Sequence, residues 1–130
     1  MPPRTSATLT EAELRLMNVL WQHGPATVHQ LLSALPSPNL AYNSVLTTIR
    51  VLEKKGYVKH VKDGRSHIYT PLVGQKDATR FEVRNLVSRF FKNSHELLVL
   101  NVLEDNNMDA EELKRLTELL ETGKKRNGEV

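Results

Sequence analysis

The sequence contains no cysteine in its 130 residues. This absence excludes disulfide bonds, thiolate metal sites and cysteine nucleophiles. The sequence also lacks a run of about 18 apolar residues, the length that a transmembrane helix needs. Residues 1–8 hold one arginine and no apolar core, which does not match a secretory signal. These absences predict a cytoplasmic protein that does not associate with a membrane.

Sequence motifs for catalysis are also missing. Nucleophile elbows, phosphate-binding loops and dinucleotide-binding fingerprints do not occur. The histidines are scattered without the spacing of a metal site, at His23, His29, His60, His67 and His95. We therefore expect a binding protein, not an enzyme, with no metal or cofactor.

Positive charge is concentrated in the first part of the chain. The net charge of +3 divides into +4 for residues 1–73, with eight Lys and Arg against four Asp and Glu, and −1 for residues 74–130, with ten against eleven. A basic surface on one part of a protein is typical of contact with a polyanion, although domains with neutral partners also reach this charge. We expect the first part to be the one that meets nucleic acid.

Capping signals predict two helices near the N-terminus. Thr10 followed by Glu13 forms a capping box, and so does Thr27 followed by Gln30. The Gly24-Pro25 pair between them ends the first helix. A third helix is expected from about Leu40 to Lys55, with Asn39 as its N-cap and Gly56 as its left-handed terminator.

A β-hairpin is expected directly after the third helix. Residues 57–62 and 66–72 are rich in strand-forming side chains, and Asp63-Gly64 between them is a strong signal for a two-residue hairpin turn. Three helices followed by a hairpin form a winged helix-turn-helix. We expect a mainly α fold with a β wing, in which residues 1–73 form the DNA-binding domain.

The third predicted helix has the features of a recognition helix. Its apolar positions share one face, and Asn43, Thr47, Arg50 and Lys54 follow one another as a stripe on the opposite face, flanked by Ser44 and Thr48. Arginine can pair with guanine and asparagine with adenine in the major groove. The alternative is an ordinary polar surface. It is disfavoured because Glu53 is the only acidic residue between Thr27 and Lys62.

The predicted wing carries further cations. Lys62 and Arg65 flank the turn, where they can hold the DNA backbone; a solvated basic hairpin is the alternative. The full set of residues that we expect to contact double-stranded DNA is Thr27, Asn43, Ser44, Thr47, Thr48, Arg50, Lys54, Lys62 and Arg65.

The second part of the chain is predicted to be a helical dimerisation domain over residues 74–123, followed by a flexible tail over 124–130. The segment 97–103 is apolar almost all round and must be covered on every side. A second chain can provide this cover; the alternative is that the helix folds back on its own wing domain. A twofold dimer implies a palindromic operator. The residues expected at the dimer interface are Phe81, Leu86, Phe90, Leu97, Leu98, Leu100, Leu103, Leu116 and Leu120.

Several segments together resemble the penicillinase-repressor family (BlaI/MecI/CopY). They are Leu9-Thr10-Glu11-Ala12-Glu13, Met17 to Trp21 with Gly24, Thr27-Val28, Tyr42 through Val58, and Asp63-Gly64-Arg65 to Tyr69. The similarity runs from about Leu9 to Leu120. It implies repression of promoters, among them those of β-lactam-responsive genes, by a dimer held together through its C-terminal helices. The cysteine motif of the copper-responsive branch is absent.

The resemblance also implies a way to inactivate the protein. In antibiotic-responsive members, the signal of a membrane sensor leads to proteolysis after an asparagine in the dimerisation region. Asn101-Val102 is the matching bond here, with Val102 where those members have phenylalanine. Two other functions stay open: a winged-helix regulator that senses a small ligand, and a winged helix that binds only other proteins.

Overall fold

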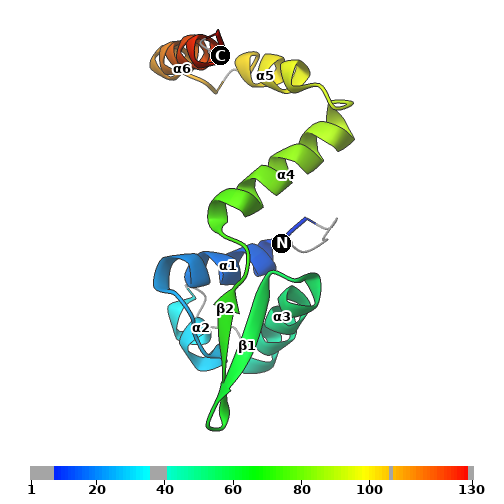
Figure 1. Ribbon diagram of the computed structural model, residues 1–130, viewed down its shortest axis with the longest axis vertical. Coiled ribbons are helices and arrows are strands. Elements are labelled where there is room, and N and C mark those ends of the chain that lie inside the picture. The colour runs from blue at the N-terminus through cyan, green and yellow to red at the C-terminus, as the bar shows by residue number, and fades with distance from the viewer. Residues whose placement is uncertain (1–7, 36–40, 106, 129–130) are drawn as a thin grey trace. The chain divides into compact units, whose positions relative to one another are not determined.

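The computed structural model describes residues 8–35, 41–105 and 107–128 (Figure 1). They divide into two compact units, Met1–Asn85 and Leu86–Val130. The prediction of a mainly α fold with a winged helix-turn-helix is confirmed. The elements in chain order are α1 (Glu11–His23), α2 (Val28–Ala34), α3 (Tyr42–Lys55), β1 (Val58–Asp63), β2 (Ser66–Pro71), α4 (Gln75–Phe90), α5 (His95–Leu103) and α6 (Ala110–Gly128).

Both predicted capping boxes are present. The Thr10 hydroxyl accepts a hydrogen bond from the Glu13 amide at 3.2 Å, and the Glu13 carboxylate accepts one from the Thr10 amide at 2.9 Å. Thr27 and Gln30 repeat this exchange at 3.2 and 2.8 Å. Each box satisfies amide groups that the first helical turn leaves without a partner, so α1 and α2 begin where the sequence predicts.

The third helix begins later than predicted. It starts at Tyr42, and its N-cap is Ala41, whose side chain makes no capping hydrogen bond. The predicted cap, Asn39, lies outside the described residues. The end of α3 agrees with the prediction, because Gly56 adopts a left-handed conformation with φ of 86°.

The hairpin turn is displaced by one residue from its predicted place. Asp63 pairs with Ser66 at the end of the antiparallel ladder, so the two-residue loop is Gly64-Arg65 and not Asp63-Gly64. Gly64 has φ of 63°. A glycine with positive φ at the first loop position is what a type II′ turn requires, and that turn suits the twist of the strands.

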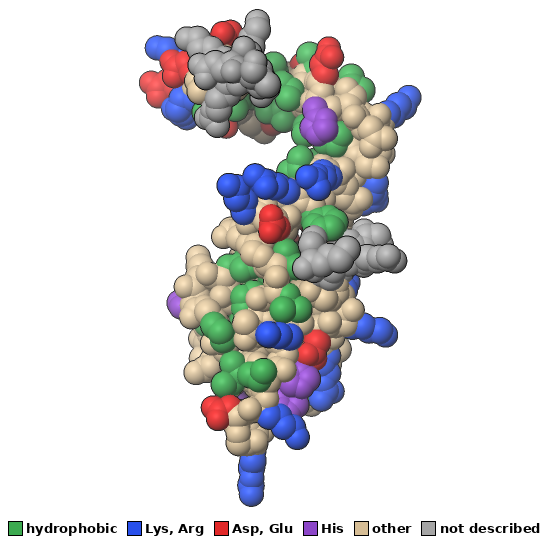
Figure 2. All heavy atoms as spheres, viewed as in Figure 1, with side chains coloured by type: hydrophobic (Ala, Val, Ile, Leu, Met, Phe, Trp, Pro, Cys, Tyr) green, Lys and Arg blue, Asp and Glu red, His purple; other side chains and the backbone are tan. Residues whose placement is uncertain are grey.

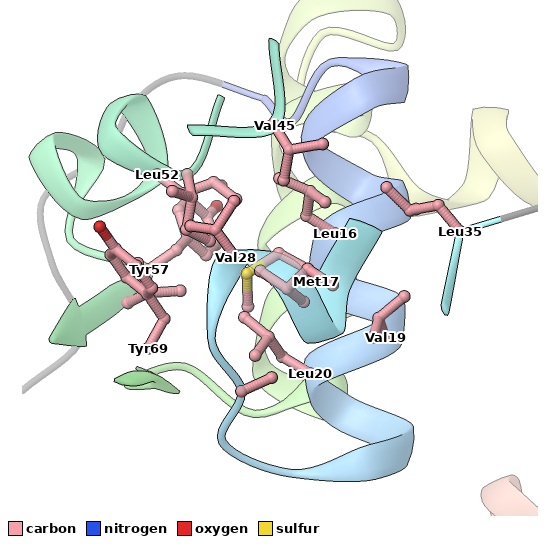
Figure 3. Packing of buried hydrophobic residues seen from close by; sticks show 14 of the residues in the cluster. Leu16, Met17, Val19, Leu20, Val28, Leu35, Val45, Leu52, Tyr57 and Tyr69 are labelled. Atoms are coloured by element: carbon pink, nitrogen blue, oxygen red, sulfur yellow. The ribbon is translucent and has the colours of Figure 1, made fainter. Parts of the chain in front are cut away.

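The first unit encloses one apolar core. Sixteen buried side chains, from α1, α2, α3, the hairpin, the start of α4 and the segments that connect them, form a single cluster, and Figure 3 shows 14 residues of it. Two contacts close it at the edges: Ala26 pairs with Tyr69 of β2, and the Trp21 indole donates to the Val73 carbonyl at 2.9 Å. Tyr42 departs from the prediction that it belongs to the apolar face, because its side chain is 39% exposed.

The second unit has little core of its own. Among its described residues Val87 is the only buried apolar side chain, and no residue of α5 is buried. A turn with positive φ at Lys92 and Asn93 separates α4 from α5. The apolar segment 97–103 thus forms the predicted helix, but within this unit it is covered only in part, and none of its side chains is buried.

The last helix is longer than predicted. Asp109 accepts a hydrogen bond from the Glu112 amide at 2.7 Å and caps its start as expected. Gly123 does not end it, because α6 continues to Gly128, so residues 124–128 of the predicted tail are helical. An interior glycine weakens a helix by only about 1 kcal/mol, and the lysines and arginine that follow it are good helix formers. Among the described helices, none is both long and apolar enough to span a bilayer.

Candidate nucleic-acid interface

The surface of α3 divides as its sequence pattern predicts. Val45, Ile49 and Leu52 are buried in the core of the first unit. The opposite stripe, with Asn43, Thr47, Arg50 and Lys54, is exposed. The helix therefore presents amide, hydroxyl and cationic groups outward from a rigid base, which is the arrangement that a groove-reading helix needs.

The flanking residues Ser44 and Thr48 lie toward α1. Together with Arg15 and neighbouring apolar residues they line a small hollow of about 110 Å³. The Thr48 hydroxyl donates to the Ser44 carbonyl at 2.9 Å, and Thr47 makes the equivalent bond to Asn43 at 2.8 Å. Because these hydroxyl protons are used within the helix, both threonines can offer a ligand only acceptor and methyl contacts.

A second hollow joins α2, α3 and the hairpin. Its volume is about 290 Å³, and it brings together Thr27, Arg50 and Arg65, three of the predicted DNA-contacting residues from three different elements. Its other lining residues are Val28, His29, Tyr42, Leu46, Ser66 and His67. Basic side chains are found around the hairpin end of this unit (Figure 2). The structure thus gathers residues that are up to 38 positions apart into one concave, cationic surface.

Sequence reasoning missed part of this hollow. The rings of His29 and Tyr42 lie 4.7 Å apart at its wall. Tyr42 has the helical spacing of the core residues, but it is the first residue of α3, and the buried residues of this helix begin only at Val45. Its position at the helix start was the signal that could have separated it from Val45 and Ile49.

The two faces of the hairpin differ in what they carry. Lys62 is paired with His67 and His60 with Tyr69, so these side chains share the face toward α3, whereas Lys59 lies on the other face. The rings of His60 and His67 are stacked at 4.4 Å with an interplanar angle of 12°. Lys62 therefore extends from the face of the hairpin that is turned toward α3.

Among the residues that the structure describes, the cations of this surface have no acidic partner. Within the described ranges, no carboxylate lies within ion-pair distance of Arg50, Lys54, Lys62 or Arg65. Glu53 is instead held by His60, whose Nδ1 lies 2.5 Å from its carboxylate. These positive charges are therefore available to phosphate groups.

The buried tyrosine behind this surface responds to the same charges. Burial raises the pKa of the Tyr69 hydroxyl above its ordinary value of 10.0, and the negative charge of Glu53 raises it further, while Arg50 opposes the shift. Tyr69 thus stays neutral and serves as part of the core.

Comparison with known proteins gives concordant results. Residues 9–122 match the family profile described as Penicillinase repressor. The chain is 30% identical over 122 residues to the penicillinase repressor of Bacillus licheniformis, covering 93% of this chain and 95% of that protein. It is 31% identical over 119 residues to the transcriptional regulator BlaI of Mycobacterium tuberculosis (strain H37Rv), covering 88% and 86%. A solved structure titled as a possible transcriptional regulator for arsenical resistance shares the fold, with a TM-score of 0.51 and 24% identity over 73% of this chain and 88% of that one.

Proposed function

The chain belongs to the penicillinase repressor family and is a DNA-binding transcriptional repressor, not an enzyme, and from this premise we propose that it binds palindromic operators as a homodimer. Each subunit inserts α3 into the major groove and holds the backbone with its wing. Because it must reach the chromosome, we place it in the cytoplasm. The Bacillus licheniformis relative is named as a penicillinase repressor, and by that likeness we propose β-lactam-responsive genes as targets.

The hollow shared by α2, α3 and the hairpin carries the proposal for DNA contact. Arg50 and Arg65 line it from two elements and have no acidic partner in the described part of the chain. We assign base contacts to Arg50, Asn43 and Thr47, because their side chains suit base edges. The other predicted residues contact the backbone: Thr27, Ser44, Thr48, Lys54, Lys62 and Arg65.

Binding to an operator-like palindrome, measured by gel shift over a salt series, tests this assignment. We expect Arg50→Ala to cost about 1–3 kcal/mol on the operator and to relax base preference at one position. Lys62→Ala should weaken binding to all DNA sequences alike. It should also lower the slope of log affinity against log salt concentration by about 1. Lys59→Ala is the matched control, because Lys59 is a cation on the opposite face of the same hairpin. Equal effects of Lys62→Ala and Lys59→Ala would contradict the proposed wing contact.

The uncovered apolar surface supports the proposal of a dimer. Of the residues predicted at the interface, Phe81, Leu98 and Leu116 are half-buried and the others are exposed. Apolar side chains that stay exposed within one chain gain free energy when a second copy covers them. We therefore propose residues 74–123 as the dimerisation domain. Two copies related by a twofold axis would present two recognition helices to two half-sites.

We further propose that a protease acting downstream of a membrane sensor inactivates the repressor by cutting between Asn101 and Val102. Asn101 is the single polar residue in the run 97–103, and its side chain is exposed in α5. A helical bond must unfold locally before it enters a protease site, and a helix without buried residues opens readily. The cut would separate α6 from the rest of the interface and dissociate the dimer.

Cleavage in induced cells, followed by immunoblotting, tests this switch. Asn101→Ala should block the cut and keep the target genes repressed. Asn107→Ala is the matched control, an exposed asparagine beyond the end of α5, and it should be cleaved normally. Normal cleavage of Asn101→Ala would refute the assigned bond.

A further inference from the structure

The junction between α3 and the wing contains a tether that DNA contact does not by itself explain. We propose that Glu53 is a positioning residue: through His60 it fixes the direction of the wing relative to the recognition helix, and so sets how Arg65 and Lys62 meet DNA. This inference rests on the proposed function, because it concerns the same α3 and wing surface. Glu53 itself contacts no DNA in this proposal.

The geometry of the tether favours this role. One carboxylate oxygen of Glu53, Oε2, accepts a hydrogen bond from the His60 backbone amide at 3.1 Å and lies 2.5 Å from His60 Nδ1. The first bond holds the backbone of β1 and not only a side chain. Hydrogen bonds to a charged acceptor are stronger than neutral ones, so the carboxylate fixes this strand at one point on α3.

The tether lies where the attached part of the hairpin ends and the free tip begins, so it can set the direction of the tip. The Ala26–Tyr69 pair attaches β2 to the segment between α1 and α2 at the rung where Tyr69 pairs with His60, and the Tyr57 amide, which donates to the Leu52 carbonyl at 2.9 Å, holds the base of the hairpin. In the described structure no hydrogen bond joins residues 61–68 to a helix. The rung of His60 and Tyr69 is therefore the last one that hydrogen bonds attach to the rest of the unit, through Glu53 on the β1 side and Ala26 on the β2 side, and the tip projects beyond the helices of its unit (Figure 1).

The tether also leads into the DNA-contacting hollow. The His60 ring stacks on the His67 ring, and His67 lines the hollow together with Arg50 and Arg65. A change in the position of His60 would therefore move His67 and the adjacent wall of the hollow. This arrangement connects Glu53 to the distance between Arg50 on α3 and Arg65 on the wing.

The charge of Glu53 supports a positioning role. A carboxylate on a surface that meets phosphate lowers the affinity for DNA through repulsion. Glu53 is the only acidic residue of α3 and is about one-third exposed. An unfavourable charge is tolerated here because its hydrogen bonds direct the wing.

A double-mutant cycle measures whether Glu53 acts through the wing. Affinity for an operator-like palindrome and for unrelated DNA is determined for the full-length protein, Glu53→Ala, Arg65→Ala and the double variant. Arg65→Ala alone should weaken binding about tenfold, because it removes a charge-assisted hydrogen bond to phosphate. In the Glu53→Ala background the same substitution should weaken binding at least about threefold less, because the misdirected wing no longer places Arg65 on the backbone.

Two further variants separate positioning from charge and from folding. Asp63→Asn also removes one negative charge, from the wing and without a hydrogen bond to a helix, and the effect of Arg65→Ala should remain tenfold in that background. Glu53→Gln keeps an oxygen acceptor for the His60 amide, so it should restore most of the Arg65 effect. If circular dichroism shows that Glu53→Ala does not fold, Glu53→Met replaces it in the cycle, because methionine is also a good helix former and has no oxygen acceptor for the His60 amide; the Arg65 effect should fall by the same factor.

The outcomes distinguish this inference from the proposed function. If Arg65→Ala is without effect in the parent protein, the proposed wing contact fails and the positioning role fails with it. If Arg65→Ala weakens binding equally in all backgrounds, the wing contact stands and the role of Glu53 is refuted. If Asp63→Asn reduces the Arg65 effect as much as Glu53→Ala does, the coupling is only electrostatic and the inference is wrong.

Discussion

The two compact units differ in how they satisfy their apolar residues. The first, Met1–Asn85, buries sixteen side chains in one cluster. In the second, Leu86–Val130, Val87 alone is buried among the described apolar residues. The large apolar side chains that it leaves exposed are those of Leu86, Phe90, Leu97, Val99, Leu100, Val102, Leu103, Leu113, Leu119 and Leu120. The first unit therefore has the core of an independent domain, whereas the second leaves most of its apolar side chains exposed, as the proposed dimer interface requires.

This difference is what the proposed dimer would require: a winged helix that is complete within one chain, and C-terminal helices that a second chain covers. Full burial of a valine, leucine or phenylalanine side chain contributes about 1.5–3 kcal/mol. Ten such side chains, even if each is only partly covered, give a free energy large enough to offset the several kcal/mol that association costs. DNA recognition and subunit association are thus assigned to separate sets of residues.

Truncation of a core residue in the first unit is expected to have the largest effect. Ile49→Ala should lower the free energy of unfolding by about 2–5 kcal/mol, because Ile49 is fully buried and its removal leaves a cavity. Urea unfolding followed by the fluorescence of Trp21, the only tryptophan, reports on this unit. Val61→Ala is the control, since Val61 is 51% exposed on the wing. A similar decrease in the free energy of unfolding for both variants would contradict the assignment of Ile49 to the core.

A charge on the apolar surface of the second unit should act on association instead. Leu100→Asp is expected to weaken the dimer by at least about 2 kcal/mol, roughly thirtyfold in dissociation constant, because an interface residue of this kind becomes a buried charge. Sedimentation velocity measures the change. Leu100→Met keeps the apolar surface and should leave the dimer intact. If the parent protein is a monomer at all accessible concentrations, the proposal that this unit mediates dimerisation is wrong.

Local sequence signals predicted the parts of the fold that depend on near neighbours. The capping boxes at Thr10 and Thr27 join residues three positions apart, so the sequence alone identifies them. The apolar spacing of α3 correctly placed Val45 and Ile49 inside. These features follow from helix geometry, which needs no knowledge of the rest of the chain.

Features that depend on distant or competing contacts could not be predicted in the same way. The hairpin loop is Gly64-Arg65 and not the predicted Asp63-Gly64, because Asp63 pairs with Ser66 in the ladder. The pairing register of the strands cannot be deduced from the turn residues alone. The bond between Glu53 and His60 joins a helix to a strand whose relative placement the whole core determines. Gly123 is a residue of the type that commonly ends helices, but it lies within α6.

The pH dependence of stability should also originate in the first unit. Burial raises the pKa of the Glu13 carboxyl group, but hydrogen bonds from Lys55 and Thr10 and the attraction of Lys55 outweigh it, so the pKa lies below the ordinary value of 4.5. The Glu13–Lys55 distance is 2.7 Å. A lowered folded-state pKa adds stability above pH 4.5, and this contribution is lost as the pH falls through the lowered value.

Glu13→Gln tests that contribution. It should cost about 1.5–3 kcal/mol at pH 7, because it removes a buried charge-assisted hydrogen bond. The difference from the parent protein should narrow as the pH is lowered from 6 to about 3. Urea midpoints by Trp21 fluorescence at several pH values provide the measurement. A difference that stays constant over this range would show that the loss is due to packing and not to the carboxylate charge.

Removal of equivalent helix caps from the two units gives the smallest expected effect and the most direct comparison between them. The hydroxyls of Thr10 and Ser94 both accept a hydrogen bond from an amide three residues ahead, at 3.2 and 3.1 Å. Thr10→Ala should lower the unfolding free energy reported by Trp21 by about 1 kcal/mol. Ser94→Ala should leave that signal unchanged, because α5 contributes nothing to the core around Trp21. If both variants shift the Trp21 transition equally, the two units unfold as one, and the division of the chain into an independent domain and an interface is wrong.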